Sequence, residues 1–175
     1  DGASGSLSNL KIEIHGIAAG VDATGIRAGV DSTIRGLVIK EFETGIKIHG
    51  GYTDDLGTIT IDHNVIGLDI ENNPAGNGTG IGITAGDQGE GYFGSATVNI
   101  TGNTISSNST AVSSTAVNQY EGGFIYITMD NNRIGTTIDQ ILDRGNGNFG
   151  VLADGGGTFT NNIFAFNGHE QVGYP

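Results

Sequence analysis

The hexapeptide IDHNVI at residues 61–66 decides the fold of this chain, because its pattern returns along the sequence. A large apolar residue stands first, Asn stands fourth, and a second apolar residue stands sixth. The same pattern recurs in ITGNTI at 100–105, MDNNRI at 129–134 and FTNNIF at 159–164, and IRGLVI at 34–39 is a copy with Leu37 in the Asn position. A repeat on this scale indicates stacked, equivalent structural units.

A second, shorter motif alternates with the first. Thr-Gly-Ile occurs at 24–26, 44–46 and 79–81, with weaker copies in TAV at 110–112 and FGV at 149–151. The interval from Gly25 to Leu37 is 12 residues and that from Leu37 to Gly45 is 8, so the repeating unit is about 20 residues long. Longer intervals contain insertions, within 45–64, 80–103 and 111–132 on one side of the unit and within 64–80 and 132–150 on the other.

Apolar and polar residues alternate inside each unit, as in TITI at 58–61, TVNI at 97–100 and IYITM at 125–129. A period of two predicts β-strands with one buried face. Because the motifs keep the same order, we expect equivalent strands to stack in parallel, one coil above the next. The sequence therefore predicts an all-β solenoid, a parallel β-helix of about six coils, with residues 1–175 as one domain. Such a domain fits either a segment of a longer protein or a filament subunit.

The repeated Asn residues are expected to occupy one corner of the coil. Asn tolerates the left-handed backbone conformation that a sharp corner needs. Stacked Asn side chains also form hydrogen-bonded ladders in other stacked-strand structures. The predicted corner ladder consists of Asn64, Asn103, Asn132 and Asn162.

The composition restricts the classes of partner. The net charge is −12 with only seven Lys and Arg residues, which disfavours nucleic acid because phosphate contacts need clustered cations. No run of about 18 apolar residues occurs, so direct membrane insertion is not expected. Abundant Gly and the absence of Cys, together with many Asn, Thr and Ser residues, are typical of a secreted or cell-surface protein.

Two stretches resemble a known class of proteins. NRIGTTID at 132–139, followed by GNGNFGV at 145–151, is similar to the repeats of large bacterial surface β-helix proteins. The whole repeat, from about Leu10 to Phe166, resembles the right-handed parallel β-helices of the pectate-lyase-like superfamily. This resemblance implies a right-handed coil. It leaves the function open, because lyases, hydrolases, adhesins and phage spikes share the fold.

Enzymes of this fold usually carry their active site on one outer sheet and its adjoining loops. Two residues after each Gly or Ala of the short motif stand Arg27, Lys47, Gly82, Ser113 and Leu152. Four residues after it stand Gly29, His49, Thr84, Thr115 and Asp154. This column lacks the pair of carboxylates that a glycoside hydrolase needs.

The nearest approximation to a pectate-lyase-like site combines basic residues with acidic calcium ligands: Lys47, His49, Asp54 and Asp55. The competing interpretation is that Lys47 and His49 are ordinary solvent-facing residues. A second pair, Asp62 and His63, has the chemistry for acid–base work. Equivalent positions in other copies hold Thr-Gly, Asp-Asn and Thr-Asn, so a repeating turn explains this pair better.

The insertions carry two further groups of candidate ligand-binding residues. Carboxylates that are candidates for calcium binding are Asp54, Asp55, Asp87 and Glu90, although solvated acidic loops would look the same. Aromatic residues that are candidates for glycan binding or self-assembly are Tyr52, Tyr92, Phe93 and Tyr120, with simple loop packing as the alternative. No cofactor is required, and calcium is the one ion that the composition suggests.

These observations predict a non-catalytic, extracellular structural or adhesive β-helix. It would self-associate end to end or side by side, on a surface or in a filament, because stacked strands leave unpaired backbone at both ends. The first alternative is a polysaccharide lyase or glycoside hydrolase fragment acting on acidic glycans. The second alternative is a carbohydrate-binding or phage-spike module.

Overall fold

The computed structural model describes residues 12–49, 57–85, 94–116, 124–168 and 170–173, which form seventeen strands and no helix. Sheet A contains β1 (Ile12–His15), β4 (Leu37–Lys40), β7 (Val65–Ile66), β10 (Thr104–Ile105), β13 (Arg133–Ile134) and β16 (Ile163–Phe164). Sheet B contains β2 (Thr24–Ala28), β5 (Thr44–His49), β8 (Thr79–Ala85), β11 (Thr110–Ala116), β14 (Phe149–Leu152) and β17 (Glu170–Gly173). Sheet C contains β3 (Thr33–Arg35), β6 (Thr58–Asp62), β9 (Ala96–Thr101), β12 (Ile125–Asp130) and β15 (Gly156–Thr160).

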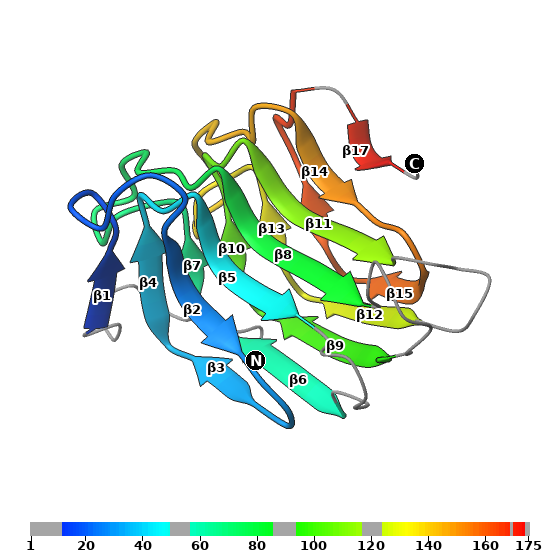
Figure 1. Ribbon diagram of the computed structural model, residues 1–175. Helices are drawn as coiled ribbons and strands as arrows, with labels where there is room; N and C mark the ends of the chain where they lie inside the picture. Colours follow the sequence, from blue (N-terminus) through cyan, green and yellow to red (C-terminus); the bar gives the residue numbers. More distant parts are fainter. Residues whose placement is uncertain (1–11, 50–56, 86–93, 117–123, 169, 174–175) are drawn as a thin grey trace.

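The three sheets form a parallel β-helix, as the sequence predicts. Every strand pairs in parallel with the strand three places before or after it, so the chain passes from sheet B to sheet C to sheet A in each coil (Figure 1). Sheets A and B hold six strands each and sheet C holds five, which agrees with the predicted number of coils. No helix in the described ranges is long and apolar enough to cross a membrane.

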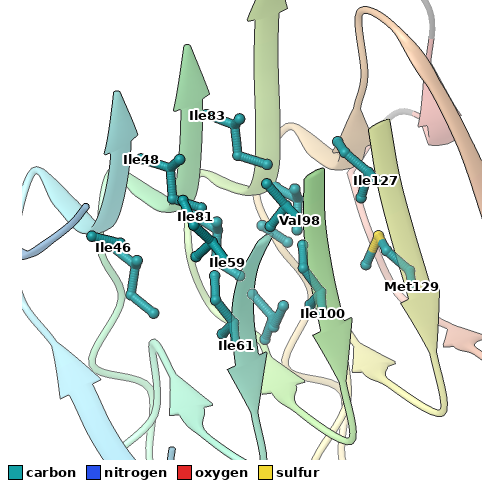
Figure 2. Close-up of a cluster of buried hydrophobic side chains, with 14 of the residues drawn as sticks. Ile46, Ile48, Ile59, Ile61, Ile81, Ile83, Val98, Ile100, Ile127 and Met129 are labelled. Atoms are coloured by element: carbon teal, nitrogen blue, oxygen red, sulfur yellow. The ribbon is translucent and has the colours of Figure 1, made fainter. Parts of the chain in front are cut away.

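The interior is filled by the apolar residues of the period-two pattern. Ile46, Ile48, Ile81 and Ile83 of sheet B point toward Ile59, Ile61, Val98 and Ile100 of sheet C (Figure 2). Equivalent residues of successive coils stack directly, for example Ile61 on Ile100 and Ile100 on Met129. β-Branched side chains suit such a pleated, closely packed surface.

The corner between sheets C and A is the same in every coil. The residue before each Asn of the repeat adopts a left-handed conformation, as His63 (φ 53°), Asn131 (φ 55°) and Asn161 (φ 54°) do. Gly36 and Gly102 take this position in the other two coils. The prediction that the repeated Asn itself is left-handed is therefore wrong by one residue, because that Asn is turned inward to serve as a hydrogen-bonding group.

The inward-turned Asn residues form a continuous ladder, which is buried at Asn64, Asn103 and Asn132 and half-buried at Asn162. The backbone N–H of Asn64 donates to Oδ1 of Asn103 at 2.8 Å, and that of Asn103 donates to Oδ1 of Asn132 at 2.9 Å. The backbone N–H of Asn132 donates to Oδ1 of Asn162, also at 2.9 Å. Each side-chain amide also donates to a carbonyl of the preceding coil, as Asn103 Nδ2 does to Ile61 O at 2.8 Å. The ladder thus supplies partners to backbone groups that the corner would leave unpaired.

A second Asn ladder follows the corner between sheets A and B. It consists of Asn77, Asn108, Asn146 and Asn167, which bond from coil to coil in the same way. The first coil of this ladder has Phe42, whose backbone N–H donates to Oδ1 of Asn77 at 3.0 Å. Leu37 holds the corresponding place in the first ladder, where its N–H donates to Asn64 Oδ1.

The length of the A-to-B corner alternates from one coil to the next. Short corners have a single left-handed residue before the ladder position: Glu41 (φ 60°), Ser107 (φ 61°) or Phe166 (φ 59°). The intervening coils instead carry the longer loops 67–76 and 135–145, each closed by an antiparallel bridge, Leu68 to Pro74 or Thr136 to Asp143. Both loops contribute to covering the outside of sheet A, where Val38, Val65 and Leu68 form a second buried cluster against Ile138.

Candidate functional site

The outer face of sheet B consists of three columns of side chains. Alternation in β5 buries Ile46 and Ile48 and turns Lys47 and His49 outward. The register places equivalent positions above one another, and the first column is Thr24, Thr44, Thr79, Thr110 and Phe149. The second column is Arg27, Lys47, Gly82, Ser113 and Leu152, as the sequence spacing predicts. In the third column His49, Thr84 and Thr115 follow one another.

A dent lies at the centre of this face, where Gly82 has no side chain. The cavity has a volume of about 180 Å³. Its rim carries one ammonium group and five hydroxyl groups, from Lys47, Thr44, Thr79, Thr84, Ser113 and Thr115. A Cβ atom on Gly82 would lie 3.4 Å from Cγ2 of Thr44, which is an ordinary contact. The backbone therefore does not require glycine here, and the missing side chain is what creates the space.

The charge around the dent is opposite to that of the chain as a whole. Arg27 and Lys47 lie on adjacent strands, with no carboxylate of the described ranges within ion-pair distance. Arg35, by contrast, has Nε 2.9 Å from Oδ2 of Asp62. Lys40 has Nζ 2.7 Å from Oε1 of Glu13, and this hydrogen bond raises the pKa of Lys40 although burial opposes the shift. Among the described residues, the basic groups of sheet B thus have no ion-pair partner that would compete with an external anion.

Only part of the predicted lyase-like site is described by the structure. Lys47 and His49 are two residues apart on β5, both on the outer face. Asp54 and Asp55 lie outside the described residues. Among the part of the chain that the structure describes, no group of three or more His, Asp or Glu side chains could hold a metal ion. The described residues that line the dent beside Lys47 carry hydroxyl groups and no carboxylate.

The other candidate residues from the insertions also lie outside the described ranges. They are the acidic residues Asp87 and Glu90 and the aromatic residues Tyr52, Tyr92, Phe93 and Tyr120. Asp62 and His63, in contrast, lie within the described residues. His63 is the left-handed residue of the C-to-A corner, and its Nδ1 contacts Oδ1 of Asp62, whose Oδ2 binds Arg35. This pair belongs to a repeating corner, as the sequence comparison between coils indicates.

Two larger hollows lie at the A-to-B corner, each over a short corner and between longer loops. The hollow of about 810 Å³ between loops 67–76 and 135–145 is lined largely by glycines and by ladder residues. Its one basic residue, Arg144, donates from Nε to Asn72 O at 3.1 Å and so joins the two loops. The other, of about 720 Å³, is lined by Asp22, Glu41 and Glu43 among others. These hollows follow from the alternation of corner lengths.

The outer face of sheet C is different in chemistry. Its central column is Thr33, Thr60, Asn99, Thr128 and Thr158. One margin carries Thr58, Thr97 and Tyr126, with Phe124 just before β12 on the same side of the strand. The Phe124 and Tyr126 rings are stacked, with centroids 6.4 Å apart. Sequence reasoning missed both aromatic residues, although their spacing of two residues placed them on one face.

The second Asn ladder was also missed from the sequence. A signal was present, because Asn77 and Asn108 each precede the small residue of the short motif by three positions. Asn146 precedes Gly150 by four positions, and this extra residue hides the pattern.

No family model, curated protein or solved structure matches this chain.

Proposed function

We propose that this chain is a non-catalytic, extracellular adhesive β-helix that binds acidic glycans on the outer face of sheet B. The observation that carries the proposal is the Gly82 dent, with the Lys47 ammonium among five hydroxyl groups. An ammonium group pairs with a uronate or sulfate, and Thr and Ser hydroxyls both donate to and accept from sugar hydroxyls. The Asn-bearing repeat also supports placing the chain among pectate-lyase-like or bacterial surface β-helix proteins.

Binding without cleavage is favoured by what surrounds Lys47. Glycoside hydrolysis uses two carboxyl groups that flank the scissile bond. Among the described residues that line the dent are five with hydroxyl groups and one with an amine, and none of them carries a carboxylate. Asp154, further along the same face, has Oδ2 engaged by the backbone N–H of Ala116 at 3.1 Å. The alternative is a lyase or hydrolase of acidic glycans. Its carboxylates would be Asp54 and Asp55, which lie outside the described residues.

Binding of a uronate polymer tests the proposal directly. We expect the chain to bind polygalacturonate oligomers, and the affinity to fall with salt because the contact is partly ionic. Lys47→Ala should weaken this binding about tenfold or more, since hydrogen bonds to charged groups contribute about 1.5–3 kcal/mol. Gly82→Thr should have a similar effect by filling the dent, and β-propensity favours Thr at this strand position.

A matched control is Arg35→Ala, which removes a cation from sheet C that is already paired with Asp62. This variant should bind as the unsubstituted chain does. Unchanged affinity in both Lys47→Ala and Gly82→Thr would reject the sheet B site. Release of unsaturated uronides from polygalacturonate would replace the adhesive proposal with the lyase alternative.

End-to-end assembly is part of the same proposal. In the part of the chain that the structure describes, β1, β2 and β3 at one end and β15, β16 and β17 at the other pair on one side only. Such edges are templates for further strands. Negative-stain images should show fibres, and calcium should favour them by bridging the −12 chain charge. Monomers alone, at high concentration and with calcium present, would contradict assembly and leave the glycan test intact.

A further inference from the structure

An exposed aromatic pair distinguishes the outer face of sheet C. Phe124 is 52% exposed and Tyr126 is 37% exposed, so both rings are open to solvent. Their planes differ by 26°, and together they form one apolar platform. Positions two residues apart on a strand share a face, which is why the two rings meet outside the coil rather than in its core. Neither ring is used by the sheet B site.

Gly156 in the next coil explains where the rings lie. It is the register partner of Tyr126. A Cβ atom on Gly156 would lie 3.1 Å from Cζ of Phe124 and 3.4 Å from Cδ2 of Tyr126. The rings therefore lean across the space that a side chain on β15 would fill. One side of the platform rests on the protein, and its other side is presented to solvent.

Uncharged hydrogen-bonding groups lead away from the platform. The central column of Thr33, Thr60, Asn99, Thr128 and Thr158 runs beside it through five coils. Thr58 and Thr97 continue the line of Tyr126 itself. Neighbouring groups are spaced about 4.8 Å between coils and about 6.6 Å along a strand. The face thus combines one stacking site with a long, regular array of donors and acceptors.

The charged side chains at the margins of this face bond within the protein. At the Thr58 margin, Asp31 accepts a hydrogen bond from the backbone N–H of Thr58 at 3.0 Å. Asp62 is paired with Arg35. Asp130 accepts hydrogen bonds from the Thr160 hydroxyl at 2.7 Å and the Asn161 amide at 2.9 Å, which lower the pKa of Asp130. The aromatic platform and the central Thr column carry no charge. An anionic ligand is therefore expected to bind to the basic groups of sheet B rather than to this face.

We infer that the outer face of sheet C is a second binding face, which takes an uncharged polysaccharide chain lying along the coil axis. Sugar rings have an apolar C–H side that stacks on Phe124 and Tyr126, and hydroxyl groups that bond to the Thr and Asn column. A protein partner fits less well, because Thr is under-represented among the residues that dominate protein interfaces. The inference rests on the adhesive function proposed above, but on separate residues, so each can fail alone.

The experiment compares two probes and two faces on the whole chain. Wild-type protein should co-sediment with an insoluble uncharged polysaccharide such as cellulose or chitin, and salt should have little effect. The double variant Phe124→Thr/Tyr126→Thr should lose about tenfold or more of this affinity, as expected for two lost stacking contacts. Thr already occupies the same column at Thr58 and Thr97, so the strand should tolerate it. Binding to polygalacturonate should be unchanged.

Lys47→Ala supplies the matched control, because it should keep binding to the uncharged polysaccharide while losing polygalacturonate. Gly156→Ala provides a second route that leaves both rings in place, since its Cβ would push them from their resting position. It should weaken uncharged polysaccharide binding as well. The inference is overturned if the wild-type protein co-sediments with neither cellulose nor chitin, or if the double variant co-sediments with them as well as the wild type does.

Discussion

The two Asn-bearing corners of the coil use one device in two settings. At the C-to-A corner every coil has one left-handed residue followed by a ladder position. At the A-to-B corner the same pair occurs in alternate coils, as Ser107 with Asn108, while the other coils replace the left-handed residue with loop 67–76 or 135–145. The ladder continues through both forms. The Asn hydrogen bonds therefore hold the corner together, whereas the segment before the Asn can vary in length.

The largest effect should come from breaking either ladder. Asn103→Leu leaves the buried N–H of Asn64 and the carbonyl of Ile61 without their side-chain partner. Asn108→Leu does the same to Asn77 N–H and Ile66 O. Each should lower the free energy of unfolding by about 3–5 kcal/mol, because every buried group left unpaired costs about 1–3 kcal/mol. Urea denaturation measures both.

Asn99→Thr is the control for those variants, since Asn99 lies on the outer face of sheet C in a column of Thr. Its effect should stay within about 0.5 kcal/mol. A much smaller loss for Asn108→Leu than for Asn103→Leu would show that the loops, and not the ladder, hold the A-to-B corner.

The glycines of the two corners should differ in the next test. Gly67 opens a longer loop with φ 92°, and a Cβ there would lie 2.1 Å from the backbone oxygen of Ser106. Gly102 has φ 65°, and the atoms nearest its added Cβ would be those of the His63 ring, at 3.0–3.2 Å. Gly67→Ala should cost about 3 kcal/mol or more and Gly102→Ala about 1 kcal/mol. Thermal unfolding of the two variants ranks them, and equal costs would contradict the distinction.

Removing a loop should cost less than breaking a ladder. We expect a chain in which residues 67–76 are replaced by Ser-Ser, copying Ser106 and Ser107, to keep its fold. The loss should be about 2 kcal/mol, mainly the burial of Leu68 against Val38 and Val65. Circular dichroism and urea denaturation test this. Loss of the β-sheet signal would mean that the loop is needed to form the coil.

The sequence predicted the regular parts of this molecule and missed the parts that depend on neighbours in space. Asn103 was found because its hexapeptide is never interrupted, whereas Asn146 was hidden by one extra residue before its short motif. The outward position of Lys47 followed from alternation. The dent at Gly82 could not be predicted, because a missing side chain becomes a cavity only when the adjacent strands are in register. The Phe124–Tyr126 platform likewise depends on Gly156, thirty residues after Tyr126.

The smallest effect is a dependence of the folded state's stability on acidic pH. It also distinguishes loop 67–76 from the C-to-A corner. Burial raises the pKa of Asp69, but hydrogen bonds from the Asn73 side chain and from the Asn73 and Glu71 amides outweigh it, so the pKa is lowered overall. The pKa of Asp130 at the C-to-A corner is lowered by the Thr160 hydroxyl and the Asn161 amide. A lowered pKa means that each carboxylate stabilises the folded state at pH values above the ordinary value of about 4. This contribution is lost as the pH falls through the folded-state value.

Asp69→Asn should reduce the loss of unfolding free energy at acidic pH by removing the carboxylate that supports loop 67–76. Asp130→Asn should reduce it by weakening the hydrogen bonds between β12 and β15. Amide hydrogen exchange at low pH should then show faster exchange confined to the loop in the first variant and to sheet C in the second. If exchange rises equally over both regions in either variant, the loop and the corner open together, and the expected separation between them is wrong.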